Sequence, residues 1–314
     1  VKNGHPEPYD VRYWGIGNEN WGGYGTHKEE TATEYATRLH KWASSIRTKY
    51  SELQLLAVGH TYDWDKTVLA QNGSLIDILT QHYYVHTLVK NDSIVDPLNS
   101  LFAPAQMEAH LAKLGMLLNE VNDRLGRGEN PITLSVDEWN NRHHVFDGEQ
   151  FRFTRNDLRR QFDVAVTAGM LNAFIRQCTA VGMANYIFPV NGHGLIRTIG
   201  DDDAFRTPLY YLFELYRQLM TGTRLDVTID GPGVTVSDLK LSIVGDASET
   251  DVVDPTLPFI DGAAVLAGDG SINIALINRS PDTPKEVNFN FPDNYFPVKK
   301  WEISDPDINA YNSA

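Results

Sequence analysis

In the first two-thirds of the chain, short apolar runs alternate with longer segments of helical periodicity. Five of these runs have the length of a buried strand: 11–17, 53–60, 77–84, 132–138 and 184–190. Strands that alternate with helices usually pair in parallel, because each helix carries the chain back to the same edge of the sheet. This region is therefore predicted to form βα units around a parallel sheet.

The segments between these runs carry the signals of four helices. In the first, Tyr35, Leu39, Trp42, Ile46 and Tyr50 recur every three or four residues, and Thr31 or Thr33 would cap it. The second is expected at 104–125, with Pro104 in its first turn and Gly126 as its end. The remaining two are expected at about 156–181 and from Pro208 to about 222.

Beyond Thr223 the periodicity changes from that of helices to that of strands. Short alternating runs, separated by Gly, Pro, Asp and Ser, lie at 225–229, 234–236, 272–277 and 287–291. Such runs are typical of an antiparallel sandwich. The sequence thus predicts a boundary near residue 222, with a βα domain over 1–222 and a β-sandwich domain over 223–314.

Composition and charge narrow the classes of function. The 314 residues are 42% hydrophobic, enough for a sizeable core, and 41 acidic against 27 basic residues give a formal charge of −14. This charge opposes binding to nucleic acid or to anionic membranes. Cys178 is the one cysteine, so an intrachain disulfide and a cysteine zinc cluster are excluded, and a buried, inert thiol is expected. No targeting signal is visible at residues 1–8, and a cytosolic and a secreted location both stay open.

Two glutamates follow the ends of predicted strands. Glu19 comes directly after the run at 11–17 and Asn18, and Glu138 closes the run at 132–138. In a βα barrel the functional side chains lie where strands end, and hydrolysis of an acetal requires two carboxyl groups. Trp21 and Trp139 lie beside the glutamates and would either stack on a sugar ring or pack in the core. The pattern predicts a glycoside hydrolase.

Two motifs at these positions resemble a known family. The segments Tyr-Trp-Gly-Ile-Gly-Asn-Glu-Asn-Trp-Gly at 13–22 and Val-Asp-Glu-Trp-Asn at 136–140 are similar to those of family 51 glycoside hydrolases, the α-L-arabinofuranosidases. Further similarity lies at 82–84, 171–176, 183–185 and 275–280. The resemblance therefore covers nearly the whole chain.

The resemblance implies a fold and a set of roles. The fold would be a (β/α)8 TIM barrel followed by an antiparallel, jelly-roll-like sandwich. Glu19 would be the general acid/base and Glu138 the nucleophile of a retaining mechanism, with Asn18 on the sugar 2-hydroxyl and Tyr84 on the nucleophile. The substrate would be an arabinose-containing oligosaccharide or polysaccharide such as arabinoxylan or arabinan. No cofactor and no metal are expected.

The chain departs from the family pattern at two places. Phe188 stands where the family usually has a glutamine, so a hydrogen bond to a sugar hydroxyl would be lost or replaced by stacking. The chain also begins about where the fourth barrel strand of the family begins, so only strands 4 to 8, and not the last sandwich strands, are expected here. A separate chain or segment would then complete the barrel, and the exposed sheet edges favour a homo-oligomer.

Several other polar residues have plainer interpretations. His82 is expected to line the site or to hydrogen-bond inside the barrel, because it has no spaced partners for a metal. Asp137 is expected to make a structural hydrogen bond. His143 and His144 are adjacent, which disfavours a shared metal ion and favours a solvated loop after Trp139.

Two alternatives to an arabinofuranosidase stay open at this point. Another clan A glycosidase, such as a β-xylosidase or an endoglucanase, would use the same pair of glutamates. A noncatalytic carbohydrate-binding fragment would keep the aromatic residues and lack turnover, and Phe188 and the absent strands favour it.

Overall fold

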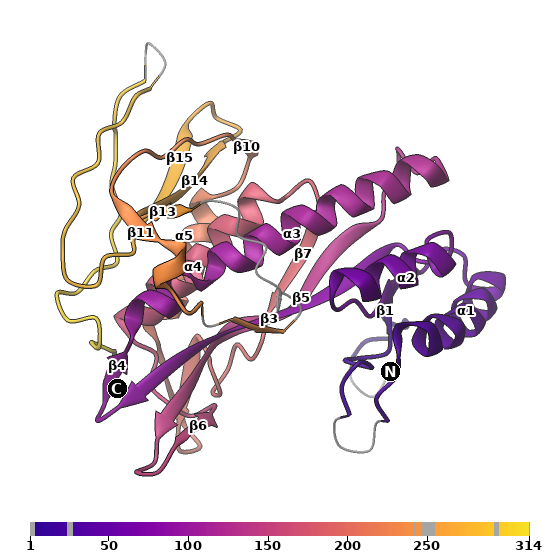
Figure 1. The fold of residues 1–314 in the computed structure, drawn as a ribbon, viewed down its shortest axis with the longest axis horizontal. Helices are drawn as coiled ribbons and strands as arrows, with labels where there is room; N and C mark the ends of the chain where they lie inside the picture. The colour runs from indigo at the N-terminus through magenta and orange to yellow at the C-terminus, as the bar shows by residue number, and fades with distance from the viewer. Residues whose placement is uncertain (1–3, 24–27, 242, 246–254, 292–294, 314) are drawn as a thin grey trace. The chain divides into compact units, whose positions relative to one another are not determined.

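A computed structural model describes residues 4–23, 28–241, 243–245, 255–291 and 295–313 (Figure 1). The chain forms two compact units. Unit 1 comprises Val1–His82, Lys113–Asp137 and Thr179–Met183, and unit 2 comprises Tyr83–Ala112, Glu138–Cys178 and Ala184–Ala314. Neither unit coincides with the boundary predicted near residue 222, and that boundary stays a prediction.

Unit 1 is built on a curled sheet with parallel strands. It contains β1 (Tyr13–Ile16), β2 (Gln54–Ala57) and the first residues of β3 (Ile78–Lys90), β5 (Thr133–Phe146) and β7 (Val181–Tyr186). The strand order is β1-β2-β3-β5 with β7 beside β5, and the β1–β2 and β2–β3 pairs are parallel. Each of the five predicted apolar runs overlaps one of these strands.

The strand bounds differ from the prediction on three strands. β3 and β5 continue to Lys90 and Phe146, well beyond the predicted ends, while β7 lies at 181–186 and not at 184–190. Residues 187–190 leave the sheet around Pro189, which has no N–H to donate to a neighbouring strand.

Two helices of unit 1 follow β1 and β2. In α1 (Ala32–Lys49) the predicted cap is present: the Glu34 amide donates to Thr31 Oγ1 at 3.3 Å, and the Thr31 amide donates to Glu34 Oε2 at 2.8 Å. The spacing of apolar residues predicts that Trp42 lies on the buried face of α1, but 59% of this residue is exposed. The sequence did not predict α2 (Tyr62–Asn72), whose inner face includes the buried polar Asp65, and buried polar residues obscure the hydrophobic period.

The long helix α3 (Pro97–Leu125) contributes to both units. The prediction that Pro104 lies in its first turn was wrong, because the helix begins at Pro97, whose missing N–H needs no acceptor there. Pro104 lies inside the helix, where its ring approaches Gly169 so closely that an added Cβ there would lie 3.1 Å away. The helix ends before Gly126, as predicted, with Gly126 at φ 66°.

Unit 2 contains the remaining helices. α4 (Gln161–Arg176) is shorter than the predicted 156–181, because the Asp163 carboxylate accepts from the Arg160 amide at 2.7 Å and caps the helix there. α5 (Pro208–Leu219) begins at Pro208 as predicted. The two helices share a core with β15 (Ile272–Asn278), formed by Val164, Ala168, Leu209, Leu212 and Ile277.

Short antiparallel strands make up the rest of unit 2. β4 (Ser93–Val95) pairs with the end of β3, β6 (Phe151–Thr154) pairs with β5, and β8 (Ile196–Ile199) pairs with β9 (Asp203–Arg206). β12 (Ile243–Gly245) also pairs with β3.

The segment after residue 222 is antiparallel, as predicted. β10 (Thr223–Leu225), β14 (Ile260–Leu266) and β15 form one sheet, and β11 (Gly233–Thr235) pairs with β13 (Thr256–Pro258). The predicted strands at 225–229 and 287–291 are wrong, since residues 226–229 and 287–291 have no regular structure. The rings of Phe289 and Phe291 still stack, with their centroids 5.2 Å apart, which agrees with the alternating pattern. Among the described residues, however, the segment has no neighbouring strand to pair with.

None of the described helices is both long and apolar enough to cross a bilayer. Cys178 is exposed, so the predicted buried thiol is wrong. α4 ends at Arg176, two residues before this cysteine, and the thiol therefore never joins the buried face of the helix.

Candidate active site

Glu19 lies in a tight turn directly after β1. Its φ of 45° and the φ of 113° at Gly17 both fall in the left-handed region, and the Gly22 amide donates to the Glu19 carbonyl at 2.9 Å. A Cβ at Gly17 would lie 2.2 Å from Asn20 Oδ1, so only glycine fits there. A non-glycine residue in this region costs about 1–3 kcal/mol, and such strain is concentrated at functional sites.

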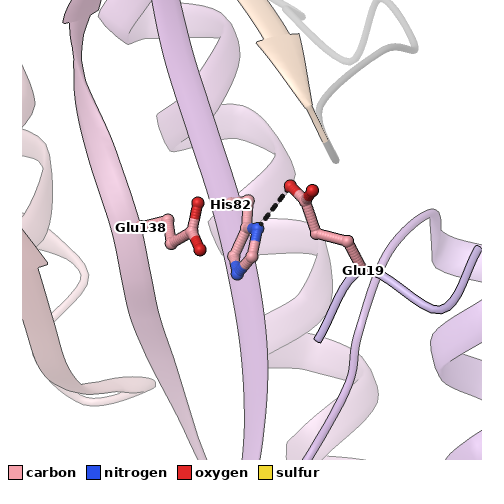
Figure 2. Close-up of side chains that lie close together, drawn as sticks. All are labelled: Glu19, His82 and Glu138. Atoms are coloured by element: carbon pink, nitrogen blue, oxygen red, sulfur yellow. Dashed lines mark hydrogen bonds and ion pairs between the residues drawn. The ribbon is translucent and has the colours of Figure 1, made fainter. Parts of the chain in front are cut away.

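His82 of β3 contacts two carboxylates of unit 1. Its Nδ1 lies 2.8 Å from Glu19 Oε1, and its Nε2 lies 3.3 Å from Asp137 Oδ1. Figure 2 shows the imidazole pointing toward Glu19. Because only 6% of the His82 side chain is exposed, this contact fixes the direction of the Glu19 carboxyl group.

Glu138 lies on β5 in unit 2, and its partner is Tyr84 of β3. The Tyr84 hydroxyl donates to Glu138 Oε2, and Tyr84 is only 3% exposed. The Arg142 guanidinium covers the Tyr84 ring, with its Cζ 3.1 Å from the ring centroid. Residues 138 and 142 are four apart on one strand and share a face, so Glu138, Tyr84 and Arg142 form one local cluster.

The two tryptophans of the motifs have different surroundings. Trp139 is 1% exposed and packs against Phe174, Tyr186 and Phe213, with ring centroids 4.9–6.0 Å apart. Of the two roles that the sequence left open, these contacts are those of packing, because Trp139 points to the opposite face of β5 from Glu138. Trp21 is half-buried and stacks on His60 at 4.1 Å. Asn18 is exposed in the turn that carries Glu19.

The prediction of a solvated loop at His143 and His144 is wrong, because β5 continues through both residues. His143 is completely buried, with Nδ1 2.5 Å from Asp157 and Nε2 2.8 Å from Asp163. Burial alone would raise the pKa of Asp163, but Arg159, 3.1 Å away, and the contact with His143 outweigh it and hold the pKa well below its usual value. No period or spacing in the sequence indicates this network.

Phe188 lies just after β7 and is 44% exposed. The Ile187 carbonyl beside it accepts from the Asn140 side-chain amide, and the Ile187 amide donates to the Trp139 carbonyl at 3.3 Å. These two bonds attach the segment that carries Phe188 to the residues directly after Glu138.

Two solved structures with a similar fold are α-L-arabinofuranosidases by name. The α-L-arabinofuranosidase from Thermotoga maritima in its arabinose complex gives a TM-score of 0.69 at 24% identity, over 90% of this chain and 54% of that chain. A family 51 α-L-arabinofuranosidase from Bifidobacterium longum gives 0.71 at 20% identity, over 90% of this chain and 56% of that one. These likenesses define the fold class.

Family profiles and relatives narrow the class further. The profile described as the α-L-arabinofuranosidase C-terminal domain matches residues 137–314, and the α-L-arabinofuranosidase 1 domain matches residues 1–97. The chain belongs to the α-L-arabinofuranosidase family. It is 27% identical to a probable α-L-arabinofuranosidase C of Aspergillus clavatus, over 99% of this chain and 61% of the relative. An exo-α-(1→6)-L-arabinofuranosidase of Bifidobacterium longum is 23% identical, over 99% and 60%. The chain thus spans about three-fifths of the length of these relatives.

Proposed function

We propose that the protein is a retaining glycoside hydrolase that releases terminal α-L-arabinofuranosyl groups from arabinoxylan, arabinan or their oligosaccharides. Membership of the α-L-arabinofuranosidase family supports the substrate class. The relative named an exo-α-(1→6)-L-arabinofuranosidase supports removal of terminal groups. The identity of the two glutamates and of their partners supports the mechanism.

The proposal depends on one observation: each of the two glutamates is hydrogen-bonded to a residue of β3. Glu19 forms a hydrogen bond with His82, and Glu138 forms one with Tyr84. Residues 82 and 84 are two apart on one strand, so their side chains leave the same face about 6.6 Å apart along it. A retaining glycosidase needs carboxyl groups about 5–5.5 Å apart, and anchoring at positions i and i+2 of one strand suits that spacing.

In the proposed first step, a Glu138 oxygen attacks the anomeric carbon while the bond from that carbon to the leaving oxygen breaks. Glu19, protonated, gives its proton to the leaving oxygen. In the second step Glu19 takes a proton from water, the water oxygen attacks the same carbon, and the ester to Glu138 breaks. The Tyr84 hydroxyl holds the Glu138 carboxylate in position for the first step, and His82 orients Glu19. Asn18 is proposed to bind the sugar 2-hydroxyl.

The finer description of the fold is part of this proposal. The parallel strands β1, β2, β3, β5 and β7 would be strands 4 to 8 of a (β/α)8 barrel, and the strands after residue 222 would form a jelly-roll-like domain. The other barrel strands would come from a further segment or partner chain. Association of copies of this chain is a prediction that light scattering would test.

The test compares two alanine variants on 4-nitrophenyl α-L-arabinofuranoside. Glu138→Ala is expected to lower kcat by roughly 10⁴-fold or more, because no nucleophile replaces the carboxylate. Glu19→Ala is expected to keep formation of the glycosyl-enzyme, since nitrophenolate leaves without a proton, and added azide should then yield a glycosyl azide.

Glu120→Ala, an exposed position on α3, is the matched control and should behave like the unaltered protein. Activity of Glu138→Ala close to that of the control would refute the assignment. Nitrophenyl β-xyloside and a cello-oligosaccharide, assayed alongside, would identify a β-xylosidase or an endoglucanase. Sugar binding by calorimetry without any turnover would favour the noncatalytic alternative.

A further inference from the structure

A hollow of about 640 Å³ lies on the surface of unit 2, within the size range of small-molecule sites. Its wall includes two phenyl rings that face solvent: Phe153 of β6 is 39% exposed, and Phe188 after β7 is 44% exposed. Exposed rings of this kind provide flat apolar surfaces on which a sugar ring can stack. The remaining lining residues are Thr154, Arg155, Asn156, Val190 and Gly192.

Arg155 holds its guanidinium against both rings. Its Cζ lies 5.0 Å from the centroid of Phe153 and 5.6 Å from that of Phe188. Cation–π contacts of this length stabilise a cation near an aromatic face without using its N–H donors. The five N–H donors of Arg155 therefore stay available to an acceptor in the hollow.

A series of side-chain contacts links the lining of the hollow to Glu138. Arg142, whose Cζ lies 3.1 Å from the Tyr84 ring centroid, also lies 5.3 Å from the Phe153 centroid. A chain of contacts therefore runs from Glu138 through Tyr84, Arg142 and Phe153 to Arg155, and all of these residues belong to unit 2. A ligand bound to Glu138 would lie a few side chains away from a ligand in the hollow.

The charge at the hollow differs from that of the whole chain. The chain carries a formal charge of −14, yet the described residues give Arg155 no carboxylate partner. Arg152, three positions earlier on the same hairpin, is paired with Asp147. A guanidinium fits a carboxylate with two parallel hydrogen bonds, so an unpaired arginine beside aromatic rings suits an anionic ligand.

The imidazoles near the hollow add no positive charge at neutral pH. His193 and His144 lie 5.8 and 5.7 Å from the Phe153 ring. Burial lowers the pKa of His193 to about 3 and also lowers the pKa of His144, with Arg159 and Arg142 respectively as the next causes. The positive charge at this place is therefore that of the arginines.

We propose that this hollow binds a uronic acid unit of the polysaccharide that carries the arabinofuranosyl group, with Phe153 and Phe188 against the sugar ring and Arg155 on the carboxylate. The inference rests on the proposed function and adds to it a preference for acidic, uronate-bearing chains. Because the net charge of the protein repels polyuronates, a local cation at the binding surface is needed for such chains to be retained.

The test uses the full chain and two arabinosylated xylo-oligosaccharides that differ only in one glucuronic acid branch. Arg155→Gln is expected to lower kcat/KM on the acidic oligosaccharide about 10–30-fold more than on the neutral one, because a charge-assisted hydrogen-bonded pair is lost. Arg152→Gln is the matched control, and its ratio should equal that of the unaltered protein. In 0.5 M NaCl the preference of the unaltered protein for the acidic oligosaccharide should weaken.

Equal losses on both oligosaccharides, or no change in the ratio, would overturn the inference. A failure of the proposed function is recognised separately, because the unaltered protein would then not hydrolyse 4-nitrophenyl α-L-arabinofuranoside. In that case calorimetric titration with a glucuronic acid-bearing xylo-oligosaccharide still decides the matter. The hollow is supported as the site if Arg152→Gln keeps the binding and both Arg155→Gln and Phe188→Ala weaken it. Absence of binding contradicts the inference.

Discussion

The two glutamates are positioned by opposite kinds of backbone. Glu19 lies in a turn that has just left β1, with its own φ at 45°. Glu138 lies inside β5, which continues for eight further residues to Phe146. Each nevertheless has a partner on β3, His82 for Glu19 and Tyr84 for Glu138. A strained turn thus orients one glutamate side chain, and a regular strand orients the other.

This difference shows which contacts set the direction of each glutamate side chain. The direction of Glu138 follows from the strict alternation of side chains along a strand, so Trp139 next to it points into the core. The direction of Glu19 depends on Gly17, on the close approach of Asn20 and on the contact with His82. Loss of a single contact on the strand should therefore lower activity and leave the fold intact, whereas a change in the turn should lower stability as well.

The largest effect in this comparison is expected from removing the partner of Glu138. Tyr84→Phe deletes one hydroxyl and keeps the ring on which Arg142 stacks, and it should lower kcat/KM about 10–100-fold, because a hydrogen bond to a charged group is lost. Steady-state kinetics on the nitrophenyl arabinofuranoside measure this.

Tyr83→Phe is the control for that variant. Tyr83 points to the other face of β3, where its hydroxyl lies 2.8 Å from His110 Nδ1. Its loss should leave kcat/KM unchanged and lower only the unfolding free energy, by about 1 kcal/mol. If the two variants lose equal activity, Tyr84 has no special role.

An intermediate effect is expected in the turn. Gly17→Ala should lower the unfolding free energy by about 1–3 kcal/mol and reduce activity as well, because alanine resists a φ of 113° and its Cβ would lie 2.2 Å from Asn20 Oδ1. Urea denaturation and kinetics of the same preparation measure both. Gly15→Ala is the control, since its Cβ would meet its nearest neighbour at an ordinary 3.8 Å. Equal stability of the two variants would show that the turn is not strained.

The smallest expected effect is a change in the unfolding free energy with pH, caused by His193. Burial lowers the pKa of His193 to about 3, while the unfolded chain has a pKa near 6.5. Below pH 6.5 the unfolded chain binds a proton that the folded chain does not, so the stability is complete above pH 6.5 and falls toward pH 3. At pH 5.5 the loss from this one residue is about 1 kcal/mol.

His193→Asn should therefore show a shallower fall in unfolding free energy between pH 7.5 and 5.5 than the unaltered protein. Urea titrations at the two pH values measure the difference. Parallel pH profiles would mean that His193 is not held neutral by the fold.

Most of the long helices and strands, and the two motifs, could be predicted from the sequence alone, although α2 could not. Short apolar runs and period-three-to-four patterns located all five strands of unit 1, α1 and α5, because they reflect local burial that any packing would require. The sequence located α4 in outline but not its bounds, of which the first is set by the Asp163 cap. The motifs around Glu19 and Glu138 likewise identified the family, which the matching profiles confirm.

Only the tertiary structure decided which partners those residues meet. The extension of β3 and β5, the burial of His143 between Asp157 and Asp163, the packing of Trp139 and the exposure of Cys178 depend on residues far apart in the chain. The same holds for the aromatic rings on either side of Arg155. A local pattern records whether a side chain is buried, but the identity of its neighbours is set by long-range contacts that leave no period in the sequence.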